Sequence, residues 1–460
     1  MNIKTKTLLV KSAFVFFILA LVPTVSSQNV PVQNAQKNEP FTFTKVELSL
    51  LEQCNLLDRR FEKEELVYTD EALNAYLDQI GKSLIPAGDT PEHVQWRFRI
   101  LRDPEENAFA LPNGSIYLHS GILSLVENES QLAAVMTHEM AHVLNRHAYI
   151  ENRSMRKKAT IINVVGAAAG AVPGYGTAAT IIRSVAKDVQ IFLVLSIYHY
   201  RRELEREADL FAAGRLLDSN YDPKEMITMF NLLNRDYDLE QIGAFYRDHP
   251  KLQERIAYVD QLLKSKTPNT APPEILAAAQ ARYLAMTEKI TRHDVQLNLD
   301  ARRYRTALAR SQKLVTFNPK STENLYYMAE SYRSLGPKTI EPTGEELSPG
   351  GREKILKMQL KMTAEEFEKN LMATPMGQSA WKTNRLNAEE QYRKALELDA
   401  NNVNAHRGLG RLYEQTERPP QAIEEYRKYL EMKPNAQDRA IIQRRLDALQ
   451  GAAKTPGKTQ

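Results

Sequence analysis

The pentapeptide His-Glu-Met-Ala-His at 138–142 constrains the local fold of this chain more than any other segment. On an α-helix, its four-residue spacing places His138 and His142 on one face. Residues 130–137 contain no Gly or Pro and favour that helix. The two imidazoles can then converge on one metal ion, while Glu139 leaves their face and can take a proton from a water. The alternative is a surface helix with two solvated histidines.

Catalytic zinc sites usually use three protein ligands, so a third ligand is expected elsewhere in the chain. The acidic segment 203–209 offers two pairs of carboxylates at helical spacing. Glu205 and Asp209 share one face, Glu203 and Glu207 share a roughly opposite one, and spacing does not choose between the pairs. In either pair, the second carboxylate would accept a hydrogen bond from a ligand imidazole and fix its tautomer. A solvated acidic face is the competing interpretation.

Residues 1–27 have the pattern of an export signal. Lysines precede a short apolar run, then come Pro23 and small residues that place cleavage after Ser27. The alternative is an uncleaved N-terminal anchor. Cys54 is the only cysteine, so no intramolecular disulfide can form, which suits a bacterial periplasm. The formal net charge is +4, and three of the lysines that contribute to it lie in the predicted signal. The rest of the chain is therefore nearly neutral, which predicts no nucleic-acid partner.

The hydrophobic pattern of 28–264 predicts an α+β domain that is mostly helical and has a small sheet. Apolar residues at helical spacing predict a helix over 70–84, and alternation predicts a strand over 94–100. A hairpin is expected to turn at the Pro-Asn-Gly of 112–114, just before the metal-binding helix. This order places a sheet beside the motif.

Residues 159–198 are rich in apolar side chains, with Gly and Pro interrupting the pattern. The breaks argue against one transmembrane helix. We interpret the segment as a mobile hydrophobic hairpin or lid near the site. Buried core helices fit the pattern equally well, and contact with a membrane surface is a third alternative.

Residues 265–273 predict a linker, and 274–450 predict an all-α domain of tetratricopeptide repeats. The repeat appears as a spacing of 34 residues, at which Tyr392 aligns with Tyr426. A long insertion near 337–387 interrupts the spacing, and 451–460 are expected to form a disordered tail. Generic helical hairpins are the alternative to repeats.

Residues 138–147 match the pattern HExxHxxxRH, and 205–209 match ExEAD. With these motifs the chain resembles the HtpX-like and CAAX-prenyl-protease-type family of zinc metallopeptidases, a gluzincin group. The resemblance implies a gluzincin-type fold and one zinc per chain. It also implies that Glu205 is the third ligand beside the two histidines, that Asp209 supports the ligands, and that Glu139 is the catalytic base.

Further motifs of the family give the other site residues. His249 lies in the pattern HPxxxxRI, where the family's histidine approaches the metal as an oxyanion donor or reversible fourth ligand. Arg202 occupies the arginine slot of an SR pair, which implies that it supports the ligands together with Asp209, although Arg201 replaces the serine of that pair. The segment 107–114 resembles the family's NAFALPGG, with Asn113 replacing a glycine. It implies a substrate-binding edge strand formed by Asn107, Ala108, Phe109, Ala110 and Leu111.

The order of export signal, peptidase domain and repeats resembles that of periplasmic family members that act in outer-membrane protein assembly. It implies an endopeptidase for unfolded or stalled envelope proteins, with repeats that dock substrates or the outer-membrane assembly machinery. The alternative is a chaperone or assembly adaptor in which the repeats bind partners and proteolysis is latent or secondary.

Overall fold

The computed structural model of the chain describes residues 43–86, 88, 90–91, 93–157, 200–233, 252–266, 271–335 and 375–454. The predicted export signal, the segment 159–198 and His249 lie outside these residues. In the described part of the chain, no helix combines the length and apolar character that crossing a membrane requires.

A three-stranded sheet lies next to the motif helix, in the order β1 (Arg97–Leu101), β3 (Ser115–His119), β2 (Ala108–Ala110). β3 runs parallel to β1 and antiparallel to β2. The predicted hairpin is therefore confirmed. Its turn requires Gly114, whose φ is +93° and whose added Cβ would lie 2.7 Å from the carbonyl oxygen of Gln95.

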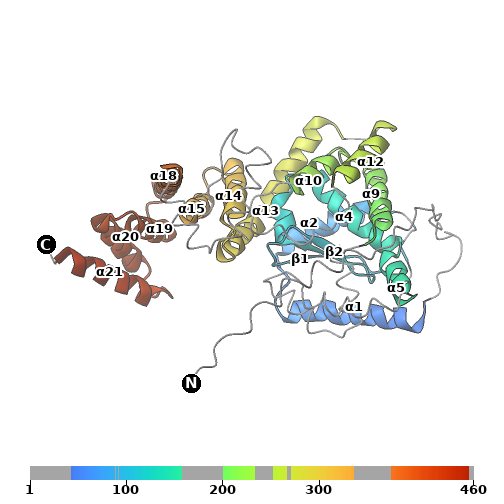
Figure 1. Ribbon diagram of the computed structural model, residues 1–460, viewed down its shortest axis with the longest axis horizontal. Helices are drawn as coiled ribbons and strands as arrows, with labels where there is room; N and C mark the ends of the chain where they lie inside the picture. The colour runs from blue at the N-terminus through green and yellow to red at the C-terminus, as the bar shows by residue number, and fades with distance from the viewer. Residues whose placement is uncertain are drawn as a thin grey trace, which may run out of the picture. The chain divides into compact units, whose positions relative to one another are not determined.

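Helices cover both faces of the sheet (Figure 1). On one face lies α1 (Lys45–Lys63), and on the other lie α2 (Glu71–Leu84) and α4 (Glu129–Leu144). Side chains alternate across the sheet, so Ile116 and Leu118 of β3 join the hydrophobic core with α2 and α4. The apolar stripe predicted for 70–84 is buried in this core.

The opposite face of the sheet is tied to α1 by polar contacts. Asp58 accepts hydrogen bonds from the hydroxyls of Ser115 (2.8 Å) and Tyr117 (2.5 Å). The side-chain amide of Asn113 donates to Asn55 (2.9 Å) and Asp58 (2.8 Å). The residue that departs from the family's glycine therefore anchors the hairpin turn to α1.

The described residues of the first half contain five further helices. They are α3 (Ser120–Leu125), α5 (His147–Lys157), α9 (Arg202–Leu217), α10 (Glu225–Leu233) and α12 (Leu252–Lys264). α9, α10 and α5 all pack against α4, and α12 packs against α9 and α10. The motif helix therefore lies inside a shell of helices, which explains why all but two of its residues are buried.

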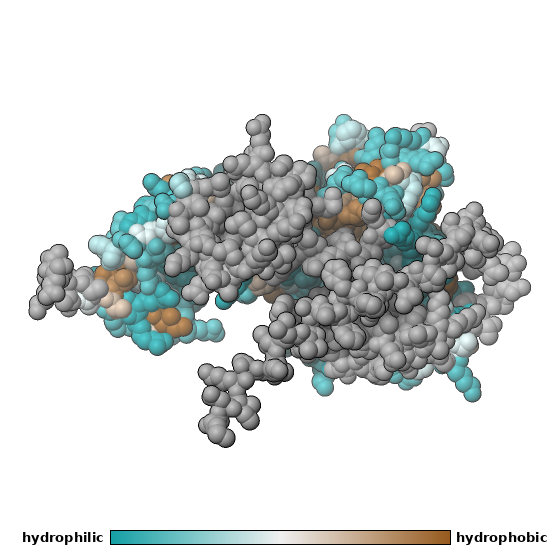
Figure 2. Space-filling model, in the orientation of Figure 1, coloured by the Kyte–Doolittle hydropathy of each residue, from teal (hydrophilic) through white to brown (hydrophobic). Residues whose placement is uncertain are grey.

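The second half is helical throughout its described residues. Its elements are α13 (Pro273–Asp300), α14 (Tyr304–Phe317), α15 (Thr322–Ser334), α18 (Pro375–Leu398), α19 (Val403–Gln415), α20 (Pro419–Met432) and α21 (Arg439–Lys454). α18 begins inside the predicted insertion, and α21 continues into the predicted tail. Figure 2 shows only small, separate apolar patches among the described residues on one face of the molecule.

The 34-residue repeat corresponds to a packing rule. Tyr392 and Tyr426 are both fully buried, and each lies against a glycine of α19. A Cβ added at Gly408 would come within 2.3 Å of the Tyr392 ring, and one at Gly410 within 2.5 Å of Tyr426. The small residues therefore admit the rings that fill the space between paired helices.

α13, the first helix after the predicted linker, packs against α3 of the first half. Its Tyr283 hydroxyl donates to the carbonyl of Leu123 (2.6 Å), and Ser120 donates to its Asp294 (2.9 Å). Tyr283 also belongs to the same hydrophobic core as α4. The repeat helices thus start from a helix that is built into the first half.

Candidate metal centre

Three side chains from two neighbouring helices converge next to the sheet. His138 and His142 come from α4, and Glu205 comes from the first turn of α9. The Nε2 atoms of the two histidines lie 3.1 Å apart. Glu205 Oε2 lies 3.6 Å from His138 Nε2, and Glu205 Oε1 lies 3.7 Å from His142 Nε2. Ligands held about 2.1 Å from a tetrahedral zinc are about 3.4 Å apart. The triangle therefore fits a zinc ion, and among the described residues no other group of three or more such side chains has this geometry.

His138 is oriented by Asp209, one turn further along α9. Its Nδ1 lies 3.0 Å from Asp209 Oδ1, so the proton on Nδ1 leaves the Nε2 lone pair for the metal. Burial by itself lowers the pKa of His138, but the hydrogen bond and charge of Asp209 and the charge of Glu205 outweigh it and raise the pKa. The imidazole is therefore electron-rich, as expected of a ligand.

Asp209 is itself fully buried and held by α12. Arg255 donates to both of its oxygens, from Nε at 2.8 Å and from Nη2 at 2.7 Å, and the hydroxyl of Tyr258 donates to Oδ2. Burial alone would raise the pKa of Asp209, but Arg255 and His138 hold it well below its usual range. Arg255 Nη1 also lies 3.8 Å from Glu205. One guanidinium thus supports two of the acidic groups.

His142 is oriented through a different route. Its Nδ1 lies 2.9 Å from Nδ1 of His147, and His147 Nε2 lies 3.5 Å from Glu207. If His147 Nε2–H donates to Glu207, the lone pair on His147 Nδ1 accepts a hydrogen bond from His142 Nδ1–H, which leaves His142 Nε2 for the metal. Arg146, with φ of +56°, makes the turn that brings His147 back to the site.

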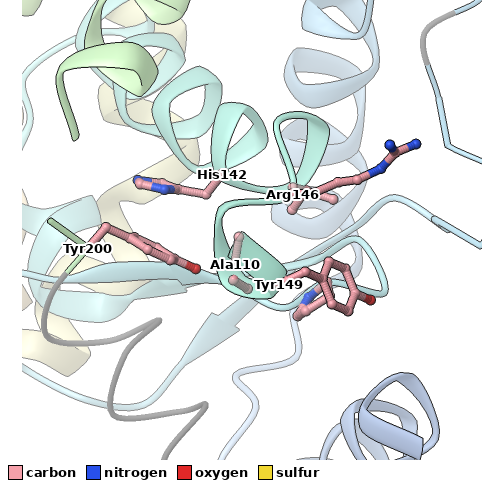
Figure 3. A pocket seen from close by; sticks show the side chains of 8 residues that line it. Ala110, His142, Arg146, Tyr149 and Tyr200 are labelled. Atoms are coloured by element: carbon pink, nitrogen blue, oxygen red, sulfur yellow. The ribbon is translucent and has the colours of Figure 1, made fainter. Parts of the chain in front are cut away.

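An aromatic ring also covers His142. Tyr200 stacks on it with ring centroids 4.2 Å apart and an interplanar angle of 17° (Figure 3). In the same view the side chain of Arg146 extends away from His142. Together with Ala110 and Tyr149, these residues line a pocket on the His142 side of the site.

Glu139 lies beside the metal triangle and is 8 % exposed. Burial raises its pKa to about 8, and the charge of Glu205 adds to the shift while His138 and Arg255 oppose it. A carboxylate with a raised pKa is a stronger base than a solvated one. It lines a pocket together with His138 and Ala108, as expected of a group that accepts a proton from a water beside the metal ligands.

β2 runs past this pocket as the edge strand of the sheet. The backbone of Asn107 and Leu111 bonds to β3, through His119 N–H to Asn107 O (3.1 Å) and Leu111 N–H to Ser115 O (2.8 Å). In an antiparallel ladder every second residue bonds to the partner strand, so Phe109 also faces Tyr117 of β3 and the residues that alternate with these three face the opposite side. Ala110 therefore directs its N–H and C=O, and Ala108 its C=O, toward the edge that no described strand pairs with, while the N–H of Ala108 donates to Asn107 Oδ1 (2.7 Å).

The structure distinguishes the two carboxylate pairs that spacing left tied. Glu205 and Asp209 are buried at the site, whereas Glu203 is exposed and Glu207 contacts His147. Arg202 is exposed at the start of α9, and its predicted role stays a prediction.

Sequence reasoning missed the contributions of four residues. Arg255 and His147 lie inside the motifs HPxxxxRI and HExxHxxxRH, and Tyr258 follows Arg255 by one helical turn, so the motifs carried a signal for these three. Tyr200 has no such signal, because it follows 159–198 and reaches His142 only through the tertiary fold.

Comparison with known proteins agrees with this geometry. Residues 71–263 match the family model of peptidase family M48, and 408–436 match a tetratricopeptide repeat. A putative beta-barrel assembly-enhancing protease of Vibrio cholerae is 31 % identical over 49 % of this chain and 47 % of its own length. The beta-barrel assembly-enhancing protease of Escherichia coli K12 is 29 % identical over 47 % of this chain and 43 % of its own.

A more distant relative comes from a eukaryote. The mitochondrial metalloendopeptidase OMA1 of Schizosaccharomyces pombe is 26 % identical over 41 % of this chain and 52 % of its own length. The chain thus spans about half the length of these relatives. The matched region contains both histidines, Glu139 and Glu205.

Proposed function

We propose that this chain, whose residues 71–263 form a peptidase family M48 domain, is a zinc-dependent endopeptidase. The observation that supports it most is the convergence of His138, His142 and Glu205 within 4.8 Å of one another, with Glu139 beside them. Two imidazoles and one carboxylate are a donor set used by catalytic zinc sites, which keep a further position for water.

When bound, zinc would lower the pKa of a water toward neutrality and polarise the peptide carbonyl. Glu139 accepts the proton of the attacking water and passes it to the nitrogen of the leaving amine. Asp209 holds the tautomer of His138 throughout. The role implied for His249, donation to the oxyanion, belongs to the same proposal.

The substrate would lie extended along the free edge of β2. The N–H and C=O of Ala110 and the C=O of Ala108 would pair with it as a further strand, while Asn107, Phe109 and Leu111 would fix the strand through β3. Main-chain pairing is independent of side-chain identity, so it suits an enzyme that acts on many unfolded chains.

We place the enzyme in the periplasm, where it would act on unfolded or misassembled envelope proteins. The export signal predicted for 1–27 supports the compartment, and relatives named beta-barrel assembly-enhancing protease support a role in outer-membrane assembly. The repeats would dock substrates or the assembly machinery and raise the local substrate concentration. Contact of 159–198 with a membrane surface would fit this setting.

Replacing Glu139 by Gln tests the activity. Cleavage of an unfolded protein such as casein should fall at least 100-fold in the Glu139→Gln variant, while its zinc content stays unchanged, because only proton transfer is lost. Glu203→Gln is the matched control: it also removes one carboxylate, but from an exposed position near the start of α9. Undiminished cleavage by Glu139→Gln would refute the proposal.

A chaperone or adaptor function is the second candidate, because the repeat helices form their own hydrophobic core and offer a surface for partners. The full-length Glu139→Gln chain should then still delay aggregation of an unfolded outer-membrane protein. Full-length protein is needed because α13 packs into the peptidase half. Equal aggregation with and without the chain would exclude the adaptor function.

A further inference from the structure

A short loop leads into the edge strand β2 and lies tightly on the start of α3. It comprises residues 103–107, and we call it the entry loop. The carbonyl of Asp103 accepts from the hydroxyl of Ser120 (2.8 Å) and from the N–H of Gly121 (3.1 Å). A Cβ added at Gly121 would lie 2.3 Å from the carbonyl oxygen of Glu105, so the two backbones are in direct contact. The position of the entry loop therefore determines where β2 begins.

Two adjacent acidic residues of the entry loop pair with arginines of the repeat half. Arg303, the residue before α14, donates from Nη1 to Glu105 Oε1 (3.1 Å). Arg310, about two helical turns further on, donates from Nη2 to Glu106 Oε1. Residues at this spacing lie on one face of a helix, so one face of α14 holds the entry loop at two points.

The two ion pairs differ in burial. The side chain of Arg310 is 4 % exposed and that of Glu106 is 22 % exposed, whereas that of Glu105 is 41 % exposed. Water weakens the exposed pair. A buried arginine without its carboxylate is strongly unfavourable, so the Arg310–Glu106 pair favours one position of the entry loop. Burial raises the pKa of Glu106, and the charge of Arg310 opposes this rise and favours the carboxylate.

Glu106 also belongs to the candidate site. It lines the same pocket as Ala108 of β2 and His138 and Glu139 of α4. The next residue, Asn107, accepts a hydrogen bond from the N–H of Ala108 through its side chain (2.7 Å). A displacement of Glu106 would therefore be transmitted to the first residue of β2.

The same helix of the repeat half holds the segment before the metal-binding helix. Lys313 follows Arg310 by three residues, so the two are neighbours on the surface of α14. Its Nζ donates to the carbonyls of Ser124 (2.9 Å) and Val126, at the C-terminal end of α3. α4 begins shortly afterwards, at Glu129. α14 thus contacts the segments that precede β2 and α4, and these two elements border the pocket.

We propose that Arg310 is a positioning residue for peptide hydrolysis: through Glu106 it holds β2 where an extended peptide can pair with it. The inference rests on the proposed peptidase function and adds a helix of the repeat half to the machinery that binds the substrate. A strand that is already held in place loses less conformational entropy when a peptide pairs with it, so the peptide binds more tightly. Because Arg310 acts on binding and not on proton transfer, its loss should raise KM and leave kcat nearly unchanged.

Steady-state kinetics on a fluorogenic octapeptide tests the inference. The peptide is taken from a casein site that the wild-type chain cuts. Arg310→Gln in the full-length chain should raise KM about tenfold and change kcat less than about twofold. Arg310→Lys, which keeps the charge, should recover most of the wild-type KM. An unchanged KM in Arg310→Gln, or a loss confined to kcat, would overturn the inference.

A double-variant cycle tests the route through Glu106. Glu106→Gln breaks the same pair from the side of the entry loop, where the side chain is partly exposed, so it decides the question even if Arg310→Gln does not fold. Its KM should rise as much as that of Arg310→Gln, and the double variant should show no further rise. A Glu106→Gln variant with the wild-type KM, or effects of the two substitutions that multiply, would overturn the inference.

Arg292→Gln is the matched control. Arg292 lies on α13, and its ion pairs with Glu288 (3.0 Å) and Glu323 (3.2 Å) stay within the repeat half. Its loss should lower the thermal stability without raising KM, which separates a structural role from positioning. If Arg292→Gln raised KM as much as Arg310→Gln, general loosening of the repeat half would be the cause, and the inference would be wrong.

Hydrogen exchange gives a readout that requires no cleavage. In Arg310→Gln the His119 N–H, which donates to the carbonyl of Asn107, should exchange several-fold faster, while the amides of α21 should keep their rates. A wild-type chain that does not cut casein would overturn the peptidase proposal, and the exchange rates would still decide whether Arg310 holds β2. A chain that cuts casein, with KM and exchange unaffected by Arg310→Gln, would overturn the positioning role and leave the peptidase proposal intact.

Discussion

Two buried carboxylates are held by the same kinds of side chain in the two halves of the molecule. In the peptidase half, Asp209 accepts from Arg255 at 2.8 and 2.7 Å and from the hydroxyl of Tyr258. We call these three residues the Asp209 cluster. One lone pair of Asp209 remains for His138, at 3.0 Å, so the cluster fixes a ligand of the candidate metal centre.

In the repeat half, Glu330 accepts from Arg333 at 3.1 and 2.6 Å and from the hydroxyl of Tyr392. These three residues are the Glu330 cluster. It joins α15 to α18, and Arg411 of α19 lies 3.8 Å from the same carboxylate. No imidazole is among the contacts described for it, so its interactions end within the helices it joins.

The difference shows that an acid–arginine–tyrosine cluster does not itself indicate a functional site. Both clusters depress the pKa of a buried carboxylate, because the Arg charge outweighs the cost of burial. What distinguishes them is the further contact of each carboxylate, which is the imidazole of His138 for Asp209 and the guanidinium of Arg411 for Glu330. If this view is correct, equivalent substitutions should have similar effects on stability and different effects on zinc binding.

The largest difference is expected between Asp209→Asn and Glu330→Gln. Each should lower the free energy of unfolding by about 3–5 kcal/mol, because each takes from a buried arginine the carboxylate to which it donates twice. Only Asp209→Asn should also weaken zinc binding, by about 10–100-fold, measured by competition with a chelator. Equal zinc affinities for the two variants would show that the Asp209 cluster is purely structural.

Removal of zinc should lower the stability of the first half and leave that of the repeat half nearly unchanged. The chain has two tryptophans, Trp96 beside the sheet and Trp381 on α18, so variants that keep one of them report on one half each. At a free zinc concentration 100 times the dissociation constant, binding should add about 2.7 kcal/mol to the stability reported by Trp96. Chelation should remove this increment and change the Trp381 transition much less.

Acid should affect the halves over different pH ranges. Burial raises the pKa of Glu330, but Arg333 outweighs it and lowers the pKa to about 2 from the ordinary 4.5. The resulting stability, on the order of 2 kcal/mol, is present above pH 4.5 and lost as the pH falls toward 2. Glu330→Gln should flatten this part of the Trp381 stability curve. As the pH falls, the half reported by Trp96 should lose stability earlier, at a higher pH than the half reported by Trp381. The reason is that zinc binding requires neutral imidazoles, which become protonated first.

The smallest effects are expected for the tyrosines. Tyr258→Phe and Tyr392→Phe each remove one hydroxyl donor and should each cost about 1 kcal/mol in thermal unfolding. Tyr258→Phe should additionally weaken zinc binding a few-fold, because Asp209 would be held less rigidly. A zinc affinity unchanged within error for Tyr258→Phe would limit the support of Asp209 to Arg255.

The residues predicted from spacing were those whose geometry is local. His138, His142 and Glu139 lie within five residues of one helix, and the hairpin before them follows from alternation and a turn containing Gly114. Helix and strand periods fix such relations without reference to the rest of the chain. The choice of Glu205 over the competing pair needed the family resemblance, because helical spacing treats both faces alike.

The supporting residues depended on contacts between distant segments. Arg255 reaches Asp209 from 46 positions along the chain, and nothing in its local pattern states which carboxylate it meets. His147 required a left-handed turn at Arg146, a conformation that a non-glycine residue adopts only in a supporting context. The packing of α13 against α3 was likewise absent from the prediction, since the linker pattern indicated only a boundary.

The sequence by itself therefore determined that one helix presents two imidazoles and a carboxylate, that a hairpin precedes it, and that repeated helices follow. These features follow from the helix and strand periods, which depend only on residues that are close together in the sequence. Only the tertiary structure decided which carboxylate supports a ligand and which merely joins two helices. The Asp209 and Glu330 clusters have the same chemistry, and the position of His138 alone gives one of them access to the metal centre.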